Sequence, residues 1–258
     1  MNQDDPLRRS DSAADADRGS PASDLHSAHA RGDTWFRVAA LVGATTLPLV
    51  LIASTMADVA GSGGLNPGSS DAQMLEVFGD FRDRHLVSSA LFVMAALATL
   101  VFLGPLWVRL RAGSEALGVV AVGGGVAVAV MWVGWAGWSL IAAVAADYQD
   151  AGAARFIMVS GWESARLLVG PYLAMVGATT VAGYRHGVFG RLFNAVGLVF
   201  TVLLVFGLFP ASPAGLMGML ATLWVLIAAF VIAFSALPRP GPRQRRGRSG
   251  RLGALPNP

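Results

Sequence analysis

The fold is decided by residues 117–143, LGVVAVGGGVAVAVMWVGWAGWSLIAA, which contain no charged side chain. A helix crosses the ~30 Å hydrocarbon core of a bilayer with about 20 apolar residues, because each residue adds about 1.5 Å. This stretch is longer than that, so we expect the helix to tilt or to project beyond the lipid. It predicts a membrane protein and excludes a soluble single domain.

The composition of the whole chain agrees with this prediction. Of the 258 residues, 54% are hydrophobic and 14% are charged, and the mean hydropathy is +0.57. Soluble domains are nearer to about 25% charged. We therefore predict an all-α, polytopic membrane bundle with six transmembrane helices, at residues 36–57, 87–108, 117–143, 157–183, 191–209 and 214–236.

Two polar segments flank the predicted transmembrane domain, which occupies residues 35–237. Residues 1–34 are rich in Asp, Ser, Ala and Arg, and residues 238–258 are rich in Pro, Gly and Arg. Neither segment has enough apolar surface to offset its chain entropy, so we expect disordered tails. The first segment also lacks the apolar core and cleavage site of a signal peptide, so we expect the first span to be retained.

The arginines predict the orientation in the membrane. All 19 basic residues are arginine, and six spans place 15 of them on the side that holds both tails. The opposite side holds Arg82, Arg84 and Arg155, and Arg166 lies within the fourth span. Because positive charge is retained on the cytoplasmic side, we expect both ends to be cytoplasmic in a plasma-membrane protein.

The C-terminal tail is strongly basic. Each arginine near an anionic leaflet contributes about 1 kcal/mol, so we expect the tail to lie on anionic lipid headgroups. RNA or an acidic partner protein is the alternative, which the lack of interleaved aromatic residues disfavours. The arginines that we assign to this membrane contact are Arg243, Arg245, Arg246, Arg248 and Arg251.

One pair of charges falls inside a predicted span. Glu163 and Arg166 are three residues apart, so they share a helix face and are able to pair. Ionisable residues inside the membrane indicate a functional site by default. The alternative is structural, because residues 160–163, SGWE, match a helix-capping box if the span begins at Ser160. If the helix begins near Asp150 instead, Glu163 lies about 20 Å along its axis.

Further polar residues gather at the outer ends of the second and third spans. Together with the Glu163 pair they suggest a polar cavity that opens to the outside, or a site for a cation or a basic ligand. No spacing among them is diagnostic of a metal site, so we predict no bound metal. The plainer interpretation is that loop ends are polar because they face water. The candidate cavity residues are Glu163, Arg166, His85, Arg82, Asp83, Arg84, Asp147 and Asp150.

The first outer loop, residues 58–85, contains a helical pattern. Ser70 and Asp71 are typical of a helix start, and Met74 and Phe78 recur at helical spacing. We expect a short amphipathic helix that lies on the outer surface or is buried against the ends of the spans.

Prolines and glycines within the spans predict local distortions and close packing. Pro48 and Pro171 each remove a backbone donor, so we expect kinks, with Thr45 and Thr46 bonding freed carbonyls. The run Gly123-Gly124-Gly125 predicts close approach of neighbouring helices. Trp132 lies near the centre of its span, and we expect it to pack within the bundle.

Several chemistries are excluded by residue types that the chain lacks. It has no cysteine and no lysine, which excludes disulfides, thiolate metal sites and Schiff-base chemistry. No histidine lies in mid-membrane, so we predict no haem. No catalytic constellation is found in the sequence, so we predict no other cofactor and no enzyme. Three classes stay open: a scaffold or assembly partner, whose partner is another membrane protein or a second copy; a small-solute transporter or sensor; and a lipid-directed enzyme.

Residues 35–237 resemble uncharacterised six-helix integral membrane proteins of actinobacterial type. The resemblance rests on Arg82-Asp83-Arg84 and Arg109-x-Arg111 at the two ends of the second span. It also rests on Gly190-Arg191-Leu192 followed by Gly197-Leu198-Val199 in the fifth. It implies six spans, and it implies no activity.

Overall fold

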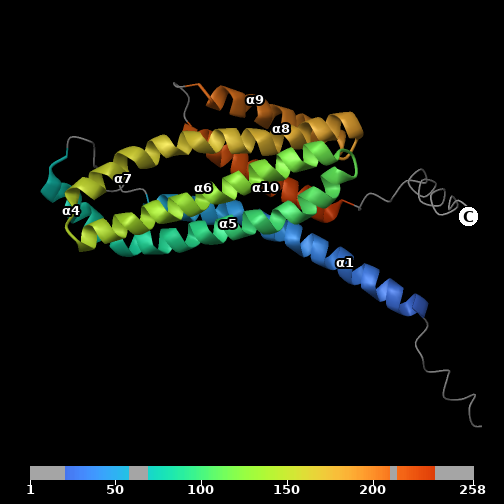
Figure 1. The fold of residues 1–258 in the computed structure, drawn as a ribbon, viewed down its shortest axis with the longest axis horizontal. Coiled ribbons are helices and arrows are strands. Elements are labelled where there is room, and N and C mark those ends of the chain that lie inside the picture. Colours follow the sequence, from blue (N-terminus) through green and yellow to red (C-terminus); the bar gives the residue numbers. More distant parts are fainter. Residues whose placement is uncertain (1–20, 58–68, 210–213, 236–258) are drawn as a thin grey trace, which may run out of the picture.

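The computed structural model describes residues 21–57, 69–209 and 214–235, apart from the side chains of residues 21–32, 158, 161–163, 165, 214 and 215. This part of the chain is all-helical, as predicted, and forms an elongated bundle (Figure 1). Its elements are α1 (Pro21–Ala44), α2 (Thr46–Ala57), α4 (Asp71–Asp80), α5 (Arg82–Arg111), α6 (Glu115–Asp147), α7 (Ala151–Ser164), η2 (Ala165–Leu168), α8 (Val169–His186), α9 (Arg191–Gly207) and α10 (Ala214–Phe234).

Five helical segments are long and apolar enough to cross a membrane. They are Asp33–Ala57, Arg82–Arg111, Glu115–Asp147, Arg166–His186 and Leu216–Phe234. The remaining predicted span corresponds to α9, which has 17 residues and is about 26 Å long, below the average bilayer thickness. The structure therefore supports a multi-pass membrane protein with five clear spans and one shorter helix beside them.

The N-terminal helix is longer than predicted. α1 begins at Pro21, so the part of the predicted tail from residue 21 onward is helical. Alanine has the highest helix propensity, and Ala22, Ala28 and Ala30 extend the first apolar span backwards in the same helix. Residues 1–20 and 236–258 lie outside the described residues, and the predictions made for them remain predictions.

A proline follows each break in the long helices, although Pro105 lies inside the unbroken helix α5. A proline ring clashes with the carbonyl four residues earlier. That residue is Ala44 for Pro48, and α1 ends at Ala44. It is Leu167 for Pro171, within the 3₁₀ turn η2. Thr45 Oγ1 donates to Val42 O (2.7 Å) and not to the Ala44 carbonyl, which Pro48 is unable to bond. Thr46 Oγ1 is buried without a hydrogen-bond partner, so the predicted bonds to freed carbonyls are not formed.

The centre of the bundle is held together by close helix packing. A Cβ at Gly124 would lie 2.7 Å from Met175 N and from Pro171 O, so the backbones of α6 and α8 nearly touch there. Gly125 faces Leu103 of α5, whereas Gly123 has no atom within 4 Å. Small residues thus permit close approach, as predicted, at two of the three glycines.

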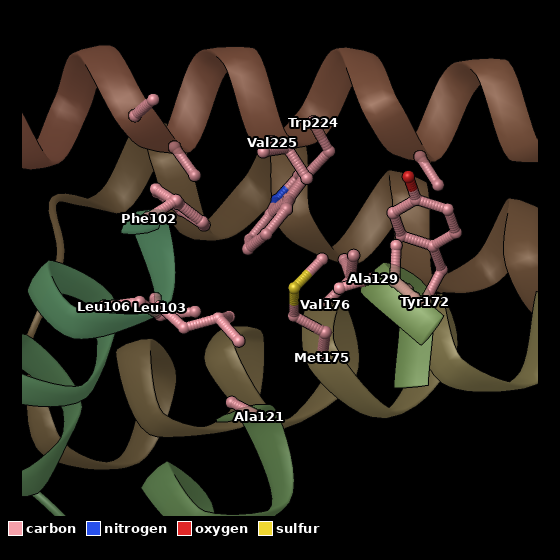
Figure 2. Packing of buried hydrophobic residues seen from close by; sticks show 14 of the residues in the cluster. Phe102, Leu103, Leu106, Ala121, Ala129, Tyr172, Met175, Val176, Trp224 and Val225 are labelled. Carbon is pink, nitrogen blue, oxygen red and sulfur yellow. The ribbon is translucent and has the colours of Figure 1, made fainter. Parts of the chain in front are cut away.

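Large side chains fill the space that these backbones enclose. Figure 2 shows Trp224 pointing from α10 toward Met175 and Val176 of α8. Trp132 is 2% exposed and stacks on Phe92 of α5, with 5.8 Å between the rings, which confirms its predicted place in the bundle.

Buried polar contacts join several of the described helices. Tyr172 Oη lies 2.9 Å from Thr222 Oγ1, and Thr222 Oγ1 donates to Gly218 O, so Tyr172 is the donor between α8 and α10. Ser88 Oγ of α5 donates to Ala53 O of α2 (2.9 Å). Such bonds hold helices together where lipid offers no competing partner.

α5 and α6 have 30 and 33 residues, about 45 and 50 Å, so both exceed the bilayer thickness. At one end of the bundle they pack against α4 and α7 (Figure 1). This end has a second apolar core, separate from that of the main bundle, and we refer to it as the cap. Its buried core residues are Met74, Phe78, Ala142, Ala145, Ala146, Ala154 and Ile157.

The opposite end, which we refer to as the basic end, holds the α5–α6 and α8–α9 turns. Gly113 packs against the Cβ atom of His186 and against Val188, which joins the two turns. Arg109 is 8% exposed, and its Nε donates to Val188 O (3.2 Å). α10 ends and α1 enters the bundle at this same end (Figure 1).

Candidate functional site: the cap

The cap is built around the amphipathic helix that the sequence predicted. Ser70 Oγ accepts a hydrogen bond from Gln73 N (3.3 Å), and this contact starts α4. Met74 and Phe78 are 0% and 2% exposed, because one face of α4 is buried against α6 and α7. The short helix is thus buried against the ends of the long helices, which was one of the two predicted placements.

Ion pairs connect the elements of the cap. Arg82, at the start of α5, contacts Asp147, at the end of α6, through two bonds: Nε to Oδ1 (2.6 Å) and Nη2 to Oδ2 (3.0 Å). Arg155 of α7 donates to Asp71 Oδ1 (2.8 Å) and to Ser69 O (2.9 Å). The first pair fastens the α5–α6 hairpin, and the second fastens α7 to the start of α4.

We expect the Arg82–Asp147 pair to stabilise the fold only weakly, because both side chains are nearly half-exposed and solvent screens them. A double-mutant cycle with Arg82→Gln and Asp147→Asn, followed by chemical unfolding in detergent, measures this coupling. An unfolding free energy that is simply additive over the two substitutions would show that the pair is not formed.

His85 is the least ordinary polar residue of the cap. It is 3% exposed, and neither Nδ1 nor Nε2 has a hydrogen-bond partner. Its ring stacks on Phe78 of α4, with 5.6 Å between ring centroids and 19° between ring planes. A buried polar group without a partner is costly, so such a position in a native fold calls for an explanation.

The other predicted cavity residues of this region are placed at the surface. Asp83 is exposed and contacts Arg82 (3.1 Å), and the Arg84 guanidinium lies 4.5 Å from the centroid of the Phe81 ring. Asp150 Oδ1 accepts a bond from Ala153 N (3.0 Å) and so caps α7. The structure brings Arg82, Asp83 and Asp147 together, while Asp150 serves the helix that follows it.

The helix that carries Glu163 does not begin at Ser160. α7 begins at Ala151, and Ser160 lies in its interior, where its hydroxyl bonds Phe156 O. The capping-box interpretation is therefore wrong, because Asp150 provides the cap ten residues earlier. Arg166 is exposed and lies in η2, at the break before α8. The Glu163 side chain lies outside the described part, so its pairing with Arg166 remains a prediction.

Sequence reasoning missed the contacts made by Asp71, Arg155, Ser88 and Ser139. Ser88 Oγ and Ser139 Oγ lie 3.4 Å apart in the core, one helical turn from His85. Ser88 lies on α5 and Ser139 on the antiparallel helix α6. The sequence would predict that they face each other only if the register of this hairpin were known. Within residues 21–57, 69–209 and 214–235, no three His, Cys, Asp or Glu residues form a group able to hold a metal ion.

The described charges differ between the two ends of the bundle. Asp33 and Glu115 are the acids of the basic end, where five arginines lie: Arg37, Arg109, Arg111, Arg185 and Arg191. The cap has three arginines and six acids: Arg82, Arg84, Arg155, Asp71, Glu76, Asp80, Asp83, Asp147 and Asp150.

Comparison of the chain with protein-family models, with curated proteins and with solved structures finds no match.

Proposed function

We propose that the chain is a non-enzymatic integral protein of the plasma membrane that acts as a scaffold or assembly partner. The observation that carries this proposal is the use of its polar side chains. Ser88, Tyr172 and Arg109 each bond a different helix or turn, and so fix the helices relative to one another. A rigid frame with a folded cap suits a protein that positions another membrane protein or a second copy.

The same proposal places the basic end in the cytoplasm and the cap outside. The excess of arginine at the basic end supports this orientation, because positive charge is retained on the cytoplasmic side. Trp35 and Tyr184 are exposed near that end, as is usual for aromatic side chains at a membrane interface. Anionic headgroups of the inner leaflet would then contact Arg37, Arg111, Arg185 and Arg191 together with the basic tail.

A second candidate is a small-solute transporter or an extracytoplasmic sensor that uses a polar cavity around Glu163, Arg166 and His85. Two observations favour it. η2 separates α7 from α8 beside Arg166, at the end of the spanning segment Arg166–His186, and interrupted helices form the binding sites of many transporters. The unpartnered nitrogens of His85 are the other.

Cysteine accessibility separates the two candidates, because the chain has no native cysteine. Single cysteines replace Ala96 and Val176, which are buried in the bundle, and Gly79 of α4, which is exposed. A water-soluble thiol reagent added outside the cell should label Gly79→Cys and spare the other two. Labelling of Ala96→Cys or Val176→Cys at a comparable rate would contradict the scaffold and support a water-filled path.

The scaffold function predicts that the protein forms a defined complex with another protein in the membrane. A benzophenone attached to Glu76→Cys, on the exposed face of α4, should give one discrete protein adduct in intact cells. The adduct should be the same at lower expression, as expected for a defined complex. The bundle position Gly123→Cys is labelled in the same way for comparison. If both variants form adducts with lipid alone, the proposal of a protein partner is contradicted.

A further inference from the structure

His85 lies at the contact between the cap and the long helices. Along α5 it stands one helical turn from Arg82 on the outer side and one turn from Ser88 on the inner side. Its ring packs on Phe78, the largest side chain that α4 buries. A change in the state of His85 therefore acts directly on the residue that holds α4 in place.

The charged groups around His85 are already engaged or point to solvent. Arg82 of α5 and Asp147 of α6 bind each other, and Arg155 of α7 binds Asp71 of α4. The described residues of α2, Thr46–Ala57, include no charged side chain. The remaining charges of α4 and α5 in this region are exposed: Glu76, Asp80, Asp83 and Arg84.

A protonated imidazole at this position would be a buried cation with two N–H donors, one more than the neutral ring has, and no acceptor in contact. Such a charge is expensive to bury, and the cost is removed if the side chain reaches water. The Phe78 ring stacks on the imidazole, so withdrawal of Phe78 with α4 would give the imidazole a path to water. The chain thus offers one simple response to protonation, which is release of α4 from the long helices.

We propose that His85 is a proton-sensing residue, and that its protonation releases α4 and opens the cap. The inference goes beyond the scaffold function and does not depend on the identity of a partner. It assigns to the cap a closed state near neutral pH and a larger open population in mild acid. Opening exposes the apolar surface of Met74 and Phe78, which a partner or the membrane surface would then be able to contact.

The expected size of the effect follows from the titration of an exposed histidine. Its pKa is about 6.5. Between pH 7.5 and pH 5, proton binding therefore raises the equilibrium constant for opening by up to about 30-fold. The closed state is favoured above pH 6.5 and loses this advantage as the pH falls. Carboxylates with an ordinary pKa near 3.9 stay ionised throughout this range, so they do not produce the same response.

Thiol labelling in the intact chain tests the proposal. Ala154 is 0% exposed in the cap core, and Gly79 is exposed on α4 with no atom near its Cβ position. The labelling rate of Ala154→Cys divided by that of Gly79→Cys cancels the pH dependence of the thiol reaction. We expect this ratio to rise more than fivefold between pH 7.5 and pH 5 when His85 is present.

Two substitutions at His85 and one elsewhere complete the experiment. His85→Phe keeps an aromatic ring on Phe78, and His85→Gln keeps a polar group, but neither titrates; both should give a ratio independent of pH. His186, exposed at the basic end, is the matched control, and His186→Gln should retain the full response. A flat ratio in the chain with His85, or an equal rise in His85→Phe and His85→Gln, would overturn the proposal.

Discussion

Replacing Gly124 by leucine should abolish most of the folded protein. A Cβ at this position would approach two backbone atoms of α8 to 2.7 Å, and backbone atoms have no alternative rotamer to adopt. The two helices would have to separate along their contact, which would also disturb Met175 and its neighbours in the main core. Overpacking costs about 1–3 kcal/mol where side chains can adjust, and we expect more here because they cannot.

The neighbouring glycine supplies the control for this substitution. Gly123 has no atom within 4 Å of its Cβ position, so Gly123→Leu adds an apolar side chain to an open face of α6. Fluorescence-detected size exclusion in mild detergent should show a monodisperse peak for Gly123→Leu and an aggregated or absent peak for Gly124→Leu. Equal peaks for the two variants would contradict the close packing of α6 and α8.

Replacing Phe78 by alanine should detach α4 and leave the main bundle intact. Phe78 is 2% exposed and contacts both the cap core and the His85 ring. Removing a buried phenylalanine costs about 3–5 kcal/mol, and a ten-residue helix has little stability of its own. Hydrogen exchange should show that the amides of α4 lose their protection, while those of α8 and α10 keep theirs.

The matched control is another phenylalanine of the cap. Phe156 of α7 is 64% exposed and contacts Trp138 at the surface, with 5.5 Å between the rings. We expect Phe156→Ala to change the exchange of α4 by less than about threefold. Loss of protection across the entire protein in Phe78→Ala would show that the cap and the bundle are one cooperative unit.

Much of the fold follows from the sequence, because the bilayer thickness sets the length of apolar sequence that a spanning helix needs. The uncharged run 117–143 lies within α6, and the helical spacing of Met74 and Phe78 correctly predicted α4. The boundaries were less predictable where apolar sequence continues outside the spanning segment. Residues 151–164 are apolar enough to extend a span, and only Pro171 and the 3₁₀ turn before it separate α7 from α8.

The candidate site was predictable in its residue types and less so in its contacts. Arg82, His85 and Asp147 were recognised as outer polar residues, yet pairing Arg82 with Asp147 requires the register of the α5–α6 hairpin. The burial of His85 depends on α4 folding over it, and a contact between helices of different spans leaves no local pattern. Likewise, the capping-box motif at Ser160 was misleading because Asp150 had already started that helix.

The central proposal is that the cap lies outside the cell and the basic end inside. Gly79 of α4 and Gly190, beside the α8–α9 turn, are both exposed with no atom near their Cβ positions, so each accepts a cysteine without strain. A membrane-impermeant thiol reagent applied to intact cells should label Gly79→Cys at once and label Gly190→Cys only after the membrane is opened. The reverse order, or labelling of both in intact cells, would contradict the orientation.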